Sequence, residues 1–528
     1  MTNNQHRDNG RSGARPPVAR QVNPDGQPVP PPATVIDVTA DQLAEQTARL
    51  LAGGARLALV AAHHDPVTHP GGPAIRVVYL FTAGPPDQRT ELHLRTDPHN
   101  PAVPSLAALS FPAGRFEREM HDLYGVQPRQ HPLPGRLVRH PHWPRGWHPM
   151  RTDAEPRPPL TESEPFPFVT VQGPGVYEIP VGPVHAGLIE PGHFRFSVVG
   201  ETILKLKARL WYVHKGIEKL FEGHPADQRT GLAERVSGDT AVGHAIAYSL
   251  AVENALGCRV PADAQRTRAA LLELERLHNH ITDIGAICND VGYGIAHTHA
   301  LRIREQLLRL NQHTTGHRLL RGGVFPGGAA VRQIPNPATI QSIADDIAEV
   351  VDIALNHTLV RDRLTGTAVL GQQQAADIGT LGYIARGSGL PHDARRNHPF
   401  TDLGDLTIPV HTSGDVLARF LIRAEEIQTS AAILTALLPT LSPATTTSWH
   451  TRPTPERPVS GVGIVEGWRG TITYRIELNP DATLTRVKIA DPSFFNWPAL
   501  PVALADTIVP DFPLTNKSFN LSYAGNDL

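Results

Sequence analysis

The loop at 185–193, HAGLIEPGH, brings one carboxylate and two imidazoles close together in a Gly- and Pro-containing stretch. Carboxylates and imidazoles can take up and release protons during a reaction. Glu190 and His193 are therefore candidates for proton transfer, and His185 is a candidate for lining a cavity. The alternative is a solvated acid with two histidines that hydrogen-bond to backbone groups, and this is the interpretation we favour for His185.

The stretch 234–244, ERVSGDTAVGH, has the frame of a metal site without its sulfur. Ser237 and Thr240 have the spacing at which two cysteines would form a thiolate clamp. Neutral hydroxyl groups do not replace thiolates as ligands of soft metals such as nickel. The residue types therefore argue against a thiolate-bound metal at this point of the chain.

Three neighbours of these hydroxyls could also take part in chemistry. The planar guanidinium of Arg235 can hold an acidic partner or a cofactor oxygen, or it can form a buried structural ion pair. His244 either contributes to the reaction or orients the loop. A buried and unpaired Asp239 would cost several kcal/mol. We therefore expect Asp239 to meet Arg235, a histidine or water, which indicates a polar, wet cavity.

Composition excludes several classes of protein. The 528 residues include 49 Lys and Arg against 51 Asp and Glu, so no basic excess points to nucleic acid. The only cysteines are Cys258 and Cys288, too few for a disulfide framework or for an iron–sulfur cluster held by this chain alone. No apolar run predicts a leader or a membrane span. We expect a cytoplasmic chain, for which any membrane association would have to come through a partner.

Periodicity and Pro-rich stretches predict the elements that position these residues. Residues 1–33 form a Pro-rich tail, 34–148 a small α+β domain, 149–178 a Pro-rich extended linker, and 179–528 a large, mainly helical domain with peripheral sheets. Long amphipathic patterns near 263–287, 336–355 and 414–438 indicate a helical bundle. The fold class is therefore α+β. No phosphate-binding fingerprint follows a strand, so we predict no nucleotide site in this chain.

Longer motifs carry a family resemblance over roughly residues 34–528. RFEREMHDLYGV at 115–126 resembles the C-type subunits of NADH-quinone oxidoreductase, respiratory complex I. From 182 onward the chain resembles the D-type subunits of that complex and their relatives, the large subunits of nickel–iron hydrogenases. The matching motifs are GPVH, YVHKGIEKL, LELERLHNHITDIG, RGSGLPHDARRNHP, GDVLARFLIRAEEI and VPDFPLTNKSFNLSY. The fusion of the two parts is most similar to the large subunit of formate hydrogenlyase and other membrane-bound, energy-converting hydrogenases.

The resemblance identifies four positions where hydrogenases carry metal-binding cysteines. Two are Ser237 and Thr240, and the second pair corresponds to Ser522 and Gly525 in NLSYAGND. All four sulfur ligands are replaced, so no nickel and no other cofactor is expected on this chain. The complex I quinone site is also altered, because the position of its quinone-contacting tyrosine corresponds to Gly238. The resemblance still implies a cavity lined by His185, Gly238 and Asp239 that could take a quinone.

Three functional interpretations follow from the resemblance. In the first, the chain is an oxidoreductase subunit that passes electrons from an iron–sulfur small subunit to a quinone or similar acceptor without a nickel–iron centre. In the second, it is a hydrogenase large subunit. In the third, it is a scaffold that couples redox chemistry to ion translocation by antiporter-like membrane subunits. Fold-level similarity does not decide between the first and the third.

Overall fold

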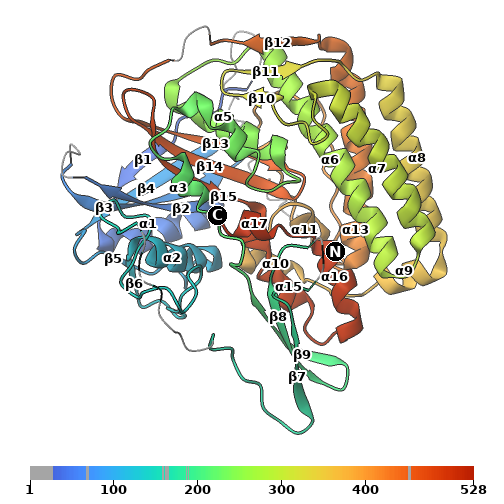
Figure 1. Ribbon diagram of the computed structural model, residues 1–528, viewed down its shortest axis with the longest axis horizontal. Coiled ribbons are helices and arrows are strands. Elements are labelled where there is room, and N and C mark those ends of the chain that lie inside the picture. Colours follow the sequence, from blue (N-terminus) through green and yellow to red (C-terminus); the bar gives the residue numbers. More distant parts are fainter. Residues whose placement is uncertain are drawn as a thin grey trace, which may run out of the picture.

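The N-terminal part of the computed structural model is a sheet of four strands covered by two helices (Figure 1). The structure describes residues 28–66, 71–156, 158, 160, 166–185, 187, 189–449 and 453–528, so the predicted tail at 1–33 lies mostly outside it. The sheet order is β1-β4-β3-β2, formed by β1 (Thr34–Asp37), β2 (Arg56–Asp65), β3 (Ala74–Ala83) and β4 (Gln88–Thr96). The two helices are α1 (Ala40–Ala52) and α2 (Phe111–Tyr124).

Helix α1 has local sequence signals at both of its ends. Thr39 is the N-cap of α1, and its backbone N–H donates to Gln42 Oε1 at 3.1 Å. Leu43 is fully buried on the inner face, and Gly53 follows the last turn. A short parallel pair, β5 (Ala102–Pro104) and β6 (Gln127–Arg129), flanks α2.

An extended arm connects this part to the rest of the chain. The described residues of the predicted linker contain no helix, and β7 (Val176–Val181) begins before its predicted end at 178. β7 pairs with β8 (His193–Val199) and β8 with β9 (Thr202–Arg209), and this small sheet projects from the molecule (Figure 1). The β7–β8 connection is the loop that carries Glu190.

A bundle of long helices dominates the remainder, on the far side of Figure 1 from the N-terminal sheet. It consists of α6 (Ala262–Asp290), α7 (Gly294–Thr315), α8 (Pro337–Asn356) and α13 (Val416–Leu437). The predicted inner face of α6 is buried as expected: Ala270, Leu274, Leu277, Ile281 and Ile284 are at most 3% exposed. Together with the sheets, the bundle confirms the predicted α+β fold class.

A second sheet lies between the N-terminal sheet and the bundle. It runs β13-β14-β15, with β13 (Val459–Gly467), β14 (Gly470–Leu478) and β15 (Leu484–Ala490), and α5 (Ala241–Leu256) crosses β13. Gly461 and Gly463 permit this crossing, because a Cβ on either would lie 1.9–2.2 Å from a carbonyl oxygen of α5. The close approach holds α5, whose first turn ends the stretch 234–244, against this sheet.

Buried ion pairs dock the N-terminal sheet onto this second sheet. Arg475 on β14 donates to both carboxylate oxygens of Glu91 at 2.9 and 3.0 Å. Arg76 on β3 donates to Glu477 at 2.7 and 2.8 Å. The two parts therefore share one packed interface, which the sequence left open. The exact domain boundaries stay a prediction.

Short elements complete the described chain. The strands are β10 (Val324–Phe325), β11 (Gly328–Val331) and β12 (Ala444–Thr447). The helices are α3 (Ile217–Phe221), α4 (Thr230–Ala233), α9 (Thr358–Leu364), α10 (Gln372–Ile378), α11 (Gly382–Gly387), α12 (Ala394–Asn397), α14 (Pro492–Asn496), α15 (Ala499–Ala503), α16 (Phe512–Phe519) and α17 (Tyr523–Asn526), with single 3-10 turns at Ala226–Gln228, Leu438–Thr440 and Val509–Asp511. Within the described residues, no helix is long and apolar enough to cross a membrane.

Candidate functional site

The turn between α4 and α5 meets the C-terminal segment at two hydroxyl groups. Ser237 Oγ and Ser522 Oγ lie 2.8 Å apart and share a hydrogen bond. Ser522 is the N-cap of α17 and accepts the backbone N–H of Gly525 at 2.9 Å. Figure 1 places α17 centrally, beside β15 and α11. The two halves of the sequence-predicted site, 285 residues apart, are thus joined directly.

Asp239 is the charged centre of this turn. It accepts two hydrogen bonds from Arg469, at 2.6 and 2.7 Å, and its Oδ1 also accepts the hydroxyls of Ser237 at 3.0 Å and Thr240 at 2.9 Å. Burial alone would raise the pKa of Asp239, but the Arg469 guanidinium outweighs it and lowers the pKa to about 2. The sequence predicted Arg235, a histidine or water as the partner of Asp239; the cation that pairs with it is instead Arg469, and the water alternative stays a prediction.

Arg469 follows directly after β13 and was not identified from the sequence. Its Nε donates to the carbonyl of Asn520 at 2.6 Å, so one side chain ties the turn to the C-terminal segment. Its guanidinium lies 4.0 Å from the ring of Trp468, whose Nε1–H donates to the carbonyl of Asp239 at 3.1 Å. The sequence signal for such a partner was Asp239 itself, because a carboxylate in apolar surroundings requires a cation from somewhere in the chain.

Glu275 on α6 accepts hydrogen bonds from the first turn of α5, next to Thr240. Its carboxyl oxygens accept the backbone N–H groups of Val242 at 2.7 Å and Gly243 at 3.0 Å, which belong to the first turn of α5. Burial raises the pKa of Glu275 to about 8, against the opposing effect of these two N–H groups. The carboxyl thus caps α5 and holds the neighbouring Thr240 in place.

Gly525 lies against Asp491, the residue that precedes α14. A Cβ on Gly525 would lie 2.5 Å from the Asp491 carboxyl carbon, so no larger residue fits there without movement. Asp491 in turn contacts His244 Nε2 at 3.1 Å, and His244 Nδ1 lies 3.0 Å from the Tyr474 hydroxyl. Both ring nitrogens of the fully buried His244 are therefore engaged. This geometry favours an orienting role for His244.

Glu190 reaches the same C-terminal segment from the β7–β8 loop. Its Oε2 accepts the backbone N–H of Ala524 at 3.0 Å, two residues from Ser522. His193 Nδ1 lies 3.2 Å from the carbonyl of Gly182, and His185 Nδ1 lies 3.2 Å from that of Pro183. The structure therefore brings Glu190 to the site and gives the two histidines backbone partners.

Arg235 and Gly238 face outward. Arg235 is exposed and donates to the carbonyl of Gly231 in its own helical turn, so the alternative of a buried ion pair is wrong. Gly238 is exposed, and a Cβ there would meet nothing within 4 Å. The side chain of Asp239 is 40% exposed. This side of the turn is therefore open to solvent.

The donor set does not fit a nickel–iron centre. Hydroxyl groups stand at three of the four positions and a glycine at the fourth, and the hydroxyls are used in hydrogen bonds to one another and to Asp239. Among the described residues, no cluster of three or more His, Cys, Asp or Glu side chains could hold a metal ion. Cys288 is fully buried in the hydrophobic core, and Cys258 Sγ contacts the carbonyl of Leu256, so neither supplies a thiolate here.

Three stretches of the chain match described protein families. Residues 36–159 match the respiratory-chain NADH dehydrogenase 30 Kd subunit, and residues 290–461 match the 49 Kd subunit of the same enzyme. Residues 215–284, which include the turn at 237–240, match nickel-dependent hydrogenase. The matches follow the chain in the order that the motifs predicted.

Curated relatives share most of their length with this chain. Hydrogenase-4 component G of Escherichia coli (strain K12) is 33% identical over 78% of this chain and 73% of its own. Formate hydrogenlyase subunit 5 of the same strain is 32% identical over 83% and 79%, respectively. The fused C/D-type subunit of NADH-quinone oxidoreductase from Phocaeicola vulgatus is 31% identical over 65% and 71%. These relatives confirm the resemblance to both families.

A solved structure shows the same fold. A chain of the membrane-bound sulfane sulfur reductase, an archaeal respiratory membrane complex, matches with a TM-score of 0.61 and 24% identity. The match covers 67% of this chain and 99% of that one.

Proposed function

Since the chain belongs to the family of large subunits that includes hydrogenase-4 component G, formate hydrogenlyase subunit 5 and the fused C/D-type subunit of NADH-quinone oxidoreductase, we propose that it works in a membrane-associated oxidoreductase complex without a nickel–iron centre. Its relatives are subunits of oxidoreductase complexes. In this proposal a small partner protein holds the iron–sulfur cluster, and the acceptor is a quinone or a similar small molecule.

The direct hydrogen bond between Ser237 and Ser522 is the observation that carries this proposal. The hydroxyl oxygens of Ser237 and Ser522 lie 2.8 Å apart and bond to each other, at positions where a nickel ion would need two thiolate ligands. Asp239 and Arg469 then neutralise each other beside them. A site with this chemistry can hold an acceptor by hydrogen bonds but cannot hold nickel by soft ligands.

Electron delivery would occur at the open side of the turn. Gly238 and the partly exposed carboxylate of Asp239 lie there. Glu190 supplies the titratable group for proton uptake, because reduction of a quinone consumes protons as well as electrons. The chain would be peripheral to the membrane, held there by partner subunits that include antiporter-like ones.

A second candidate function is a scaffold that couples redox change to ion translocation. This function is favoured because the polar side chains of the turn already have hydrogen-bond partners: Ser237, Asp239 and Thr240 are all bonded within the chain. Such a turn could transmit movement without binding an acceptor. The two functions differ in whether the complex turns over a quinone at this site.

Elemental analysis of the native complex is the direct test. We expect no stoichiometric nickel and no hydrogen-dependent dye reduction, because the donor set lacks every thiolate. We also expect an iron–sulfur protein to co-purify with the chain. A hydrogenase with intact cysteine pairs, isolated in the same way, is the positive control. One nickel per chain together with hydrogen-dependent dye reduction would overturn the proposal.

Replacement of Glu190 by glutamine tests the proton-transfer role. The amide oxygen can still accept the Ala524 N–H, so we expect normal assembly. Loss of the titratable group should lower quinone reduction by the membrane complex roughly tenfold or more. Glu201→Gln, in the exposed turn between β8 and β9, is the matched control. Unchanged turnover in the Glu190 variant would leave that residue with only its structural contact.

A further inference from the structure

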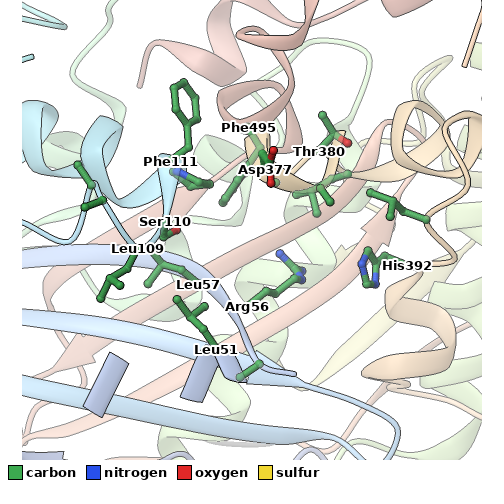
Figure 2. Close-up of a pocket in the computed structure, with 18 residues that line it drawn as sticks. Leu51, Arg56, Leu57, Leu109, Ser110, Phe111, Asp377, Thr380, His392 and Phe495 are labelled. Carbon is green, nitrogen blue, oxygen red and sulfur yellow. The ribbon is translucent and has the colours of Figure 1, made fainter. Parts of the chain in front are cut away.

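A cavity of about 510 Å³ lies between the N-terminal part and the large helical part, far along the chain from the turn at 237–240 (Figure 2). It is bounded by the α1–β2 connection, the first turn of α2, the α10–α11 segment and α14. Its size falls within the range of small-molecule sites in proteins. Its apolar wall consists of Leu51, Leu57, Leu109, Leu381, Leu390 and Phe495.

Arg56 is the charged group of this cavity. It is the first residue of β2, it is partly buried, and Figure 2 shows it among the lining side chains. Within the part of the chain that the structure describes, Arg56 has no ion-pair partner. Burial lowers the pKa of Arg56, and the carboxylate that most opposes this effect is Glu466, which already binds Arg386 at 2.9 Å. The Arg56 guanidinium therefore keeps its five donors for a ligand.

Among the other lining groups, His392 and Ser110 favour a negative charge near Arg56, whereas Asp377 opposes it. Burial and the neighbouring Arg56 lower the pKa of His392 to about 4, so at neutral pH its ring is uncharged and can donate one hydrogen bond. Ser110, the N-cap of α2, makes no capping bond to the helix, and Phe111 and Pro112 of the first helical turn also line the cavity. The carboxylate of Asp377 in the lining accepts Gln373 Nε2 at 2.7 Å and is thus partly satisfied.

We propose that this cavity binds a small amphipathic organic anion, with a carboxylate or phosphate group on Arg56 and an apolar body against Leu57, Leu381 and Phe495. The planar guanidinium matches both anions through paired hydrogen bonds. A neutral ligand would leave the cation unpaired. The site is separate from the turn at 237–240, and a bound anion would bridge β2 of the N-terminal sheet and the α10–α11 segment.

Calorimetric titration of the full-length chain with benzoate, phenyl phosphate and the neutral benzamide tests the proposal. We expect at least one of the two anions to bind, and to bind at least about tenfold more tightly than benzamide. Binding of benzoate alone assigns the site to carboxylates, and binding of phenyl phosphate alone assigns it to phosphates. If neither anion binds up to roughly 10 mM, or if benzamide binds equally well, the proposal is wrong.

Two variants locate the binding. Arg56→Gln should weaken the anion by at least about tenfold, while Arg361→Gln on the exposed face of α9 should leave affinity unchanged. Ala376→Phe, at a lining position on α10, should block the cavity while leaving Arg56 in place. Circular dichroism and thermal melting verify folding of each variant. Wild-type affinity in either Arg56→Gln or Ala376→Phe would place the anion elsewhere and refute the site.

Discussion

Replacement of Arg386 by methionine is expected to destabilise the chain by about 3–5 kcal/mol, because it leaves buried carboxylates without their cation. The Arg386 side chain is completely buried. It forms ion pairs with Glu426, with Glu466 at 2.9 Å and with Asp393 at 3.3 Å. Methionine fills much of the same volume but supplies no donor, so the loss is electrostatic rather than a matter of packing.

Urea and thermal denaturation measure this effect. If the chain unfolds as one unit, the melting temperature should fall by roughly 3–5 °C, given the unfolding entropy of a chain of this length. Arg302→Met is the matched control, because Arg302 pairs with Asp346 at 3.2 Å on the surface, where the two side chains are 52% and 38% exposed. That control should cost less than about 1 kcal/mol. Equal losses in the two variants would mean that the buried cluster contributes no more than a surface pair.

The buried charges extend beyond Arg386 and join the elements around the site. Arg395 pairs with Asp393 at 2.8 Å and reaches Glu273 of α6 at 3.4 Å, while Glu426 of α13 also binds His280 of α6 at 2.6 Å. Helices α6 and α13 are thereby fixed to the segment after α11 and to β13. Because Trp468 and Arg469 directly follow β13, this network also fixes the frame in which Arg469 meets Asp239.

Local elements of the fold could be predicted because their signals are local. The amphipathic periods of α6, α8 and α13 and the Pro-rich stretch before β7 each lie within one segment. The meeting of Ser237 with Ser522 was accessible only through the resemblance to hydrogenases, which pairs the two segments. The roles predicted for Glu190 and His193 stay predictions.

Long-range pairings could not be predicted, since hydrophobic period does not tell which buried charges meet. Asp239 was expected to find a nearby cation or water, and Arg235 was the nearest candidate in sequence. The true partner of Asp239, Arg469, lies 230 residues away in sequence. It reaches Asp239 because β13 packs closely against α5. The docking of Arg475 on Glu91 was hidden for the same reason.

The pair between Asp239 and Arg469 gives the second large effect that we expect. Arg469→Met should cost about 2–4 kcal/mol, because it leaves the Asp239 carboxylate without its cation and the Asn520 carbonyl without the Arg469 donor. Asp239→Asn should cost less, about 1–2 kcal/mol, since its side chain is 40% exposed and water screens the lost charge. Denaturation of each single variant and of the double variant gives the coupling between them.

Acid should remove the contribution of Asp239 in a defined range. Its pKa is lowered from 3.8 to about 2 in the folded chain, so the ionised form stabilises the fold above pH 4. As the pH falls from about 4 toward about 2, protonation removes this stabilisation, and the difference between wild type and Asp239→Asn should shrink. A difference that stays constant or grows between pH 7 and pH 3 would contradict the ion pair as its source.

Turnover of the double variant separates the two candidate functions. With both charges replaced by neutral groups, Asp239→Asn/Arg469→Met leaves no unpaired charge in the turn and should be more stable than Arg469→Met alone. We nevertheless expect its complex to reduce quinone more slowly than wild type, because the hydrogen-bonding groups that face the acceptor are changed. Normal assembly with lost quinone reduction supports an acceptor site at the turn. Normal quinone reduction in a folded double variant would remove the turn from electron transfer and favour the scaffold.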